Sequence, residues 1–183
     1  MIDTHKISVV VSYYNESESI VDTLNLLRMQ TLKPAEVHLI NSGSTDNTFS
    51  IINSWLAQHN IDNYYNVDAG TLVPSSSINV GIERSKSDWI ALIDCGLMFP
   101  HNWLESQLDT AVSNNADVVI GSVVLHGLNV IDQAAVSQTY GYNQIRECVP
   151  SSLIKKDIFQ RYGLFLDNRR AGYDVHWRHM INR

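Results

Sequence analysis

Short apolar runs alternate with segments of helical spacing along the first two thirds of the chain. The apolar runs predict strands at residues 7–11, 36–40, 64–67, 89–93 and 118–124. Between them, apolar residues recur three or four positions apart, which predicts amphipathic helices. The first helix is expected to begin at Asn15, because Asn15 and Glu18 resemble a capping pair, and to end before Pro34. A later one is expected from Asn102 to about Asn114.

Strands that alternate with helices predict an α/β fold with a Rossmann-like, mostly parallel sheet flanked by helices. The length of 183 residues suits one domain over 1–183. The last third of the chain is less regular. Its pattern predicts a short helix and a turn at residue 141, both within 127–144, and a short strand or sheet edge at 148–154. It also predicts a helical turn at 156–161 and a later helix that carries Asp174 near its start. The helix dipole favours an acid there, so a purely structural Asp174 is an alternative.

Asp94 ends the central apolar run and is followed at once by Cys95 and Gly96. An acid at the carboxyl end of a central strand lies where open α/β sheets bind ligands. The alternative is that Asp94 only caps the turn.

Composition excludes some classes of partner. Apolar residues make up 44% of the chain, charged residues 17%, and the net charge is −6. Lys and Arg form no cluster larger than the pairs Lys155-Lys156 and Arg169-Arg170, which argues against a nucleic-acid surface. No apolar stretch reaches 18 residues, so no membrane span is expected. Cys95 and Cys148 match no metal or disulfide pattern, which favours reduced thiols and a cytoplasmic location.

Common motifs of catalysis are weak or missing. The sequence has no Gly-x-Gly-x-x-Gly, no Walker loop and no Gly-x-Ser-x-Gly elbow. Ser152 and Lys155 fit a Ser-x-x-Lys spacing, which we interpret as coincidence among crowded serines and lysines. His176 and His179 could face one cation from a helix, although such a pair is more often a polar helix face.

Polar turns follow three of the predicted strands. They are Tyr14-Asn15-Glu16, Ser42-Gly43-Ser44-Thr45-Asp46 and Asp94-Cys95-Gly96. In a parallel sheet these turns fall on the same edge and form a cleft with acids, hydroxyls and free backbone amides. Such a cleft suits a nucleoside diphosphate.

These residues also resemble a known family. The segments 7–16, 36–48, 79–82 and 89–94, together with 149–165, are similar in order and spacing to a family 2 glycosyltransferase with the GT-A fold. The resemblance implies transfer of a sugar from a nucleoside-diphosphate-sugar to a glycan or lipid-linked acceptor in polysaccharide biosynthesis. It also implies that the transfer inverts the stereochemistry of the sugar. It implies that Asp174 takes the acceptor proton and that Asp94 is the first acid of an Asp-x-Asp motif that binds Mg²⁺ or Mn²⁺. The implied donor-binding residues are Ser12, Tyr14, Asn15, Glu16, Ser42, Asp46, Asp94 and Cys95.

The sequence departs from the family pattern at positions that bear on activity. Ser12 replaces a Pro, Asn41 and Ser42 replace paired acids, Ile78 replaces an Arg, Tyr173 replaces an acid, and Gly96 replaces the second metal-binding acid. Mg²⁺ and Mn²⁺ prefer hard oxygen ligands, which Gly96 cannot supply. The chain also ends nine residues after Asp174, as in a short or truncated member.

Three outcomes of the Gly96 substitution stay open. In the first, Asp94 holds a weak metal together with water and His176. In the second, a cationic side chain replaces the metal, such as that of Arg169, Arg170 or Arg178. In the third, catalysis is lost and the chain is a binding or scaffolding module. A nucleotidyltransferase on a similar sheet is a further alternative, but residues 12–17 lack the Gly-rich basic loop of such enzymes.

Overall fold

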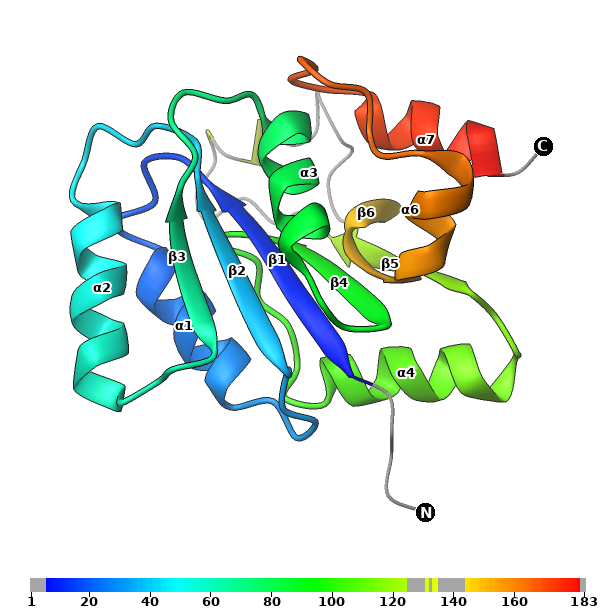
Figure 1. Cartoon of the computed structure of the whole chain (residues 1–183), viewed down its shortest axis with the longest axis horizontal. Coiled ribbons are helices and arrows are strands. Elements are labelled where there is room, and N and C mark those ends of the chain that lie inside the picture. Colours follow the sequence, from blue (N-terminus) through cyan, green and yellow to red (C-terminus); the bar gives the residue numbers. More distant parts are fainter. Residues whose placement is uncertain (1–5, 125–130, 132, 135–143, 182–183) are drawn as a thin grey trace.

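The computed structural model describes residues 6–124, 131, 133–134 and 144–181. Within these residues a six-stranded sheet has the order β3-β2-β1-β4-β6-β5 (Figure 1). Its strands are β1 (Ile7–Tyr13), β2 (Glu36–Asn41), β3 (Tyr64–Asp68), β4 (Trp89–Asp94), β5 (Val118–Val124) and β6 (Ile145–Lys155). The helices are α1 (Ile20–Arg28), α2 (Thr48–His59), α3 (Pro74–Arg84), α4 (Trp103–Ser113), α6 (Lys156–Tyr162) and α7 (Tyr173–Ile181).

The sheet is mostly parallel, as the alternation of strands and helices predicts. β1 pairs in parallel with β2 and with β4, and Val9 faces Val37 on one side and Ala91 on the other. The arrows of β1, β2 and β3 point to the same edge of the sheet (Figure 1). The chain moves outward from β1 through β2 to β3 and then returns to β4 on the other side of β1. The strand order therefore reverses between β1 and β4, where open α/β sheets bind ligands.

A hydrophobic cluster covers each face of the sheet. On one face, Val9, Leu39 and Ala91 pack with α1, α2 and α4. On the other face, Val10 and Leu92 pack with α3, α6 and α7. The central strands are buried on both faces, which explains their nearly continuous apolar sequences.

α3 packs closely against β1 because residue 81 is glycine. A Cβ atom at Gly81 would lie 2.3 Å from Cγ1 of Val10, which is closer than van der Waals contact allows. This close approach brings the first turn of α3 to the carboxyl end of β1.

Two sequence predictions differ from the structure. α1 begins at Ile20 with Ser19 at its N-cap, because Asn15 has a positive φ of 55° and binds the neighbouring turn instead of capping the helix. The strand expected at 148–154 is longer and lies inside the sheet, where β6 pairs antiparallel with both β4 and β5. The short helix and the turn expected within 127–144 fall largely outside the described residues.

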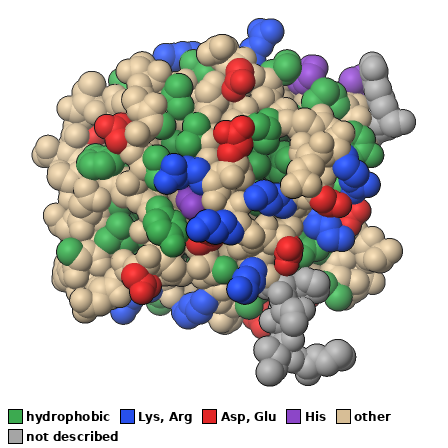
Figure 2. Space-filling model, in the orientation of Figure 1, with side chains coloured by type: hydrophobic (Ala, Val, Ile, Leu, Met, Phe, Trp, Pro, Cys, Tyr) green, Lys and Arg blue, Asp and Glu red, His purple; other side chains and the backbone are tan. Residues whose placement is uncertain are grey.

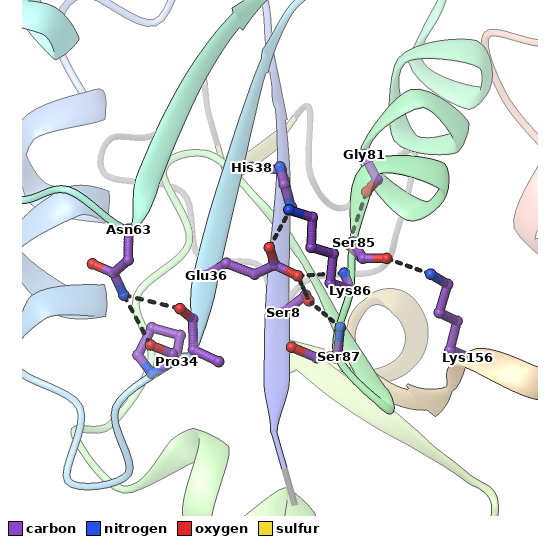
Figure 3. Close-up of polar contacts among 11 residues, drawn as sticks. Ser8, Pro34, Glu36, His38, Asn63, Gly81, Ser85, Lys86, Ser87 and Lys156 are labelled. Carbon is purple, nitrogen blue, oxygen red and sulfur yellow. Dashed lines mark hydrogen bonds and ion pairs between the residues drawn. The ribbon is translucent and has the colours of Figure 1, made fainter.

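A polar cluster is buried at the amino ends of the parallel strands, away from the edge that carries the polar turns. Glu36 accepts hydrogen bonds from the Ser8 hydroxyl and the Lys86 backbone amide, and its carboxylate lies 3.4 Å from His38 Nε2 (Figure 3). Burial lowers the pKa of His38 and so favours its neutral form. We interpret this cluster as structural, because its contacts lie within β2 or join the bases of β1 and β2 to each other and to the segment after α3.

The surface charge is uneven. Lys and Arg side chains gather in the middle of the face seen in Figure 2, although the net charge of the chain is −6. Among the helices of the described residues, none is both long and apolar enough to cross a membrane. The location expected from the sequence stays a prediction.

Candidate active site

The turns that follow β1 and β2 are hydrogen-bonded to each other. Asn15 Oδ1 accepts a bond of 2.8 Å from the Thr45 amide, and the Asn15 amide donates to Ser44 Oγ at 3.0 Å. The Ser17 amide donates to Asp46 Oδ2 at 3.2 Å. The expectation that these polar turns meet at one edge is therefore met.

Asp46 is used mainly to hold this arrangement. Its Oδ1 accepts bonds from the amide and the hydroxyl of Thr48, and its Oδ2 accepts the bond from Ser17. These bonds lower the pKa of Asp46 to about 2, since they favour the ionised form. By contrast, the Tyr14 side chain is 54% exposed and remains accessible to a ligand.

Three serine hydroxyls lie together where β1 ends. Ser12 Oγ is 2.7 Å from Ser77 Oγ, in the first turn of α3, and 3.4 Å from Ser42 Oγ. Ser42 and Ser77 are buried, so Ser12 is the most accessible of the three to a bound molecule.

Asp68 is a candidate that the sequence reasoning missed. It ends β3, is exposed, and accepts a hydrogen bond of 3.2 Å from Asn41 Nδ2. The family pattern has an acid at the position of Asn41 on β2. In this chain the acid beside that position is Asp68, which comes from β3. The signal was available, because Asp68 ends a predicted strand in the same way as Asp94.

Asp94 ends β4 and faces Ser12 across the parallel pairing with β1. Its side chain is exposed, yet the surrounding protein still desolvates the carboxylate. This desolvation, together with the negative charges of Asp174 and Glu16, raises the pKa of Asp94 to about 6. The predicted acids Asp94 and Asp174 are therefore electrostatic neighbours, although they come from β4 and α7.

Aromatic packing fixes the position of α7, which carries Asp174 in its first turn. Trp177 is fully buried, donates a hydrogen bond of 2.9 Å to the Gly163 carbonyl, and stacks on Phe159 with ring centroids 5.0 Å apart. Because Trp177 is three residues after Asp174, burial of the indole orients the first turn of the helix as well.

The segment before α7 is held by α3. Buried Asn79 donates to the Phe165 carbonyl at 2.8 Å and accepts from the Phe165 amide at 3.1 Å. Ser75 Oγ accepts from the Arg169 amide at 3.0 Å, and Ser76 Oγ accepts from the Asn168 amide at 3.1 Å. Asn79 and the two serines thus position the segment that leads to Asp174, a role that the sequence did not indicate.

Other candidates are not brought into this site. The Cys95 thiol is 3.6 Å from both Ser19 Oγ and Thr23 Oγ1, so it faces α1. Buried Ser152 accepts from the Gly121 amide and donates to the Cys148 carbonyl, while Lys155 Nζ pairs with Asp117 at 2.7 Å. The Ser-x-x-Lys spacing is therefore structural.

The residues at the expected metal position do not fit a divalent-cation site. Gly96 has a φ of 79°, a conformation that residues with side chains rarely adopt, and His176 is exposed on α7. Within residues 6–124, 131, 133–134 and 144–181, no three His, Cys, Asp or Glu side chains are grouped so that they could hold a metal ion. The alternative in which Asp94 and His176 hold a weak metal together with water stays a prediction.

Two surface hollows lie away from these acids. One is lined by residues of α1 and β3 and the loops beside them, including Arg28, Lys33 and Tyr64. The other lies between α1 and α2 and includes Val21 and Trp55. Neither contains a residue of the polar turns that follow β1 and β4.

Solved structures share this fold. TarS of S. aureus in complex with UDP-GlcNAc superposes with a TM-score of 0.74 over 96% of this chain and 52% of that one, at 18% sequence identity. The mannosyltransferase PcManGT from Pyrobaculum calidifontis, in complex with GDP-Man and Mn²⁺, superposes with a TM-score of 0.63 over 93% of this chain and 49% of that one, at 21% identity. The GT-A fold expected from the sequence is confirmed.

Sequence comparison agrees with the structural one. Glycosyltransferase AglE of Haloferax volcanii is 27% identical over 183 residues, which cover 93% of this chain and 59% of AglE. The chain thus spans about half of the two structural neighbours and 59% of AglE. The sequence model described as glycosyl transferase family 2 matches residues 8–182, and the chain belongs to that family.

Proposed function

We propose that this chain transfers a sugar from a nucleoside-diphosphate-sugar to a hydroxyl group of a glycan or lipid-linked acceptor, with inversion at the anomeric carbon. The proposal rests above all on the electrostatic effect of Asp174 on the pKa of Asp94, and on the place of Asp94 where the strand order reverses. Family membership supports the class of reaction. The complexes of TarS with UDP-GlcNAc and of PcManGT with GDP-Man support the class of donor.

In this proposal Asp174 is the general base. As the acceptor oxygen forms a bond to the anomeric carbon, its proton passes to Asp174, and the bond between that carbon and the diphosphate oxygen breaks. The diphosphate leaves with the electron pair. A carboxylate placed within hydrogen-bond reach of the acceptor contributes about 10²–10⁴-fold to such a rate.

The remaining predicted residues hold the donor. Asp94 lies near the ribose and the diphosphate, and Cys95 contributes its main chain because its thiol faces α1. The base and ribose are held by the first two turns and the serine beside them, namely Ser12, Tyr14, Asn15, Glu16, Ser42 and Asp46.

Calorimetric titration with UDP-, GDP- and dTDP-sugars, followed by donor hydrolysis and transfer assays, tests this function. We expect at least one donor to bind and to be turned over, and we expect Asp174→Asn to abolish turnover while leaving donor binding intact. If no donor of the panel binds, the proposed function is wrong.

A non-catalytic binding module is the second candidate, and Gly96 is the observation that favours it. Such a module binds a donor or its nucleoside diphosphate without turnover, and Asp174→Asn changes nothing measurable. Donor hydrolysis that disappears in both Asp94→Asn and Asp174→Asn excludes this candidate.

A further inference from the structure

The proposed reaction needs positive charge beside its leaving group. As the bond to the sugar breaks, negative charge develops on the diphosphate and must be stabilised. The acids around Asp94 have the opposite effect, because Glu16 and Asp174 both add negative charge there. Since the described residues do not fit a divalent-cation site, a cationic side chain at the same edge of the sheet would have to supply the positive charge.

Arg178 lies on α7, the helix that also carries Asp174. It follows Asp174 by one turn of α7, so both side chains lie on the same side of the helix. The guanidinium is held by an ion pair from its Nη2 to Oε2 of Glu147 on β6.

The sheet register locates Glu147. β6 runs antiparallel to β4, with Trp89 opposite Lys155 and Ala91 opposite Leu153. Because the two strands are antiparallel, the start of β6 points toward the end of β4 that carries Asp94, and Glu147 belongs to that part of β6, where it pairs with Ser122 of β5. Glu147 thus holds Arg178 at the end of β6 that points toward the edge of the sheet with Asp94.

The electrostatics of Cys148 agree with this placement. It is adjacent to Glu147, and burial raises the pKa of its thiol to about 11, with the negative charges of Asp94 and Asp174 adding to the rise and Arg178 opposing it. Charges on β4 and on α7 therefore all act on one thiol of β6.

The geometry of Arg178 also suits a phosphate ligand. A guanidinium has five N–H donors in a planar fork, which binds phosphate oxygens through paired hydrogen bonds. The Arg178 side chain is 30% exposed, so part of the fork is accessible although Glu147 occupies another part. The side chains of Arg169 and Arg170, the other cations considered from the sequence, are exposed in the loop before α7.

We propose that Arg178 supplies the positive charge for the diphosphate leaving group, and that Glu147 positions the guanidinium. This inference rests on the proposed function. Arg178 stays protonated throughout: the acceptor proton goes to Asp174, and the electron pair of the broken bond stays on the diphosphate. Transfer then proceeds without a divalent cation.

Titration of UDP and GDP in the presence of EDTA gives a test that does not depend on turnover. We expect Arg178→Ala to weaken the affinity for the diphosphate about ten- to a hundredfold, while the affinity for the matching nucleoside stays unchanged. Arg178→Lys should recover part of the loss, because it keeps the charge without the fork. Arg161→Ala is the matched control, since Arg161 pairs with Asp117 and Asp157 on exposed positions away from Asp94.

Turnover in EDTA is the second measurement. We expect the wild-type chain to keep its activity there, Arg178→Ala to lose about 10²–10³-fold in kcat, and Glu147→Gln to lose less. If Arg178→Ala binds the diphosphate and turns over like the wild type, or if wild-type activity requires Mn²⁺, the Arg178 inference is wrong while the transferase function stands. If the wild type binds neither nucleoside diphosphates nor any donor sugar, the proposed function itself fails, and the inference fails with it. Thermal unfolding of each variant shows whether it is folded.

Discussion

The negative charge of Asp174, in the first turn of α7, acts on the carboxylate of Asp94 at the end of β4. The two residues are 80 positions apart in the sequence, at 94 and 174. Their approach depends on two contacts of the second half of the chain: Trp177 buries α7 against Phe159, and Asn79 ties the preceding segment to α3.

Replacement of the candidate base should separate binding from chemistry. Asp174→Asn keeps the size and polarity of the side chain but cannot accept the acceptor proton, so we expect kcat to fall about 10²–10⁴-fold with little change in donor affinity. Asp109→Asn, at an exposed position of α4, is the matched control. Steady-state kinetics and calorimetry measure both quantities. Equal kcat values for Asp174→Asn and the control would contradict the assignment of the base.

The raised pKa of Asp94 predicts how stability depends on pH. Folding raises this pKa from 3.8 to about 6, so between these values the folded chain binds more protons than the unfolded chain. The free energy of unfolding should therefore fall as pH rises through this window, and the ionised Asp94 should be destabilising above it.

Asp94→Asn removes that ionisation. We expect the variant to gain free energy of unfolding relative to the wild type at about pH 7.5, and the gain to shrink as the pH falls from about 6 to about 4. Urea unfolding at a series of pH values measures the difference, with Asp109→Asn again as the control. A difference that does not vary with pH would show that Asp94 is not perturbed by its neighbours.

Asn79 should matter for both stability and activity. Asn79→Ala leaves the amide and carbonyl of Phe165 without their partner, which should cost about 1–3 kcal/mol of the free energy of unfolding. It should also lower kcat, because the segment that leads to Asp174 is then less well held. Ser76→Ala removes one exposed bond to Asn168 and should have a smaller effect on both. If Ser76→Ala loses more stability and more kcat than Asn79→Ala, Asn79 does not position this segment.

The close packing of α3 on β1 can be tested by a double-mutant cycle. Alanine is the better helix former, so Gly81→Ala would be stabilising on propensity alone. The Cβ would lie 2.3 Å from Val10 Cγ1, however, and we expect a net cost of about 1–3 kcal/mol. In a Val10→Ala background the cost of Gly81→Ala should be smaller, because the clashing methyl groups are absent. Additive effects in urea unfolding would rule out the contact.

Much of the first half of the molecule follows from local sequence. β1 and β4 were predictable because a parallel strand buried on both faces is nearly continuously apolar, and β2 was predictable from its short run of mostly apolar residues. Their polar turns were predictable as neighbours, since parallel strands bring their carboxyl ends to one edge. The start of α1 was not, because Asn15 forms long-range hydrogen bonds to Thr45 that a local capping pattern cannot reveal.

The site was predictable only in part. Asp94 and Asp174 were found from the strand end and from family resemblance, and Asp68 was overlooked because β3 is short and only partly buried. The support given by Asn79 and Trp177 depends on contacts between elements far apart in the chain, and no periodicity of the sequence encodes such contacts.

The sequence by itself determined which segments are buried strands, which chemical groups stand at their ends, and that Gly96 supplies no metal ligand. Only the tertiary structure decided that β6 runs antiparallel between β4 and β5 and that α7 folds back to the same edge. The physical reason is that apolar periodicity records how each element is buried but not which element buries it. The pairing of Glu147 with Arg178, and the approach of Asp174 to Asp94, arise from that second choice.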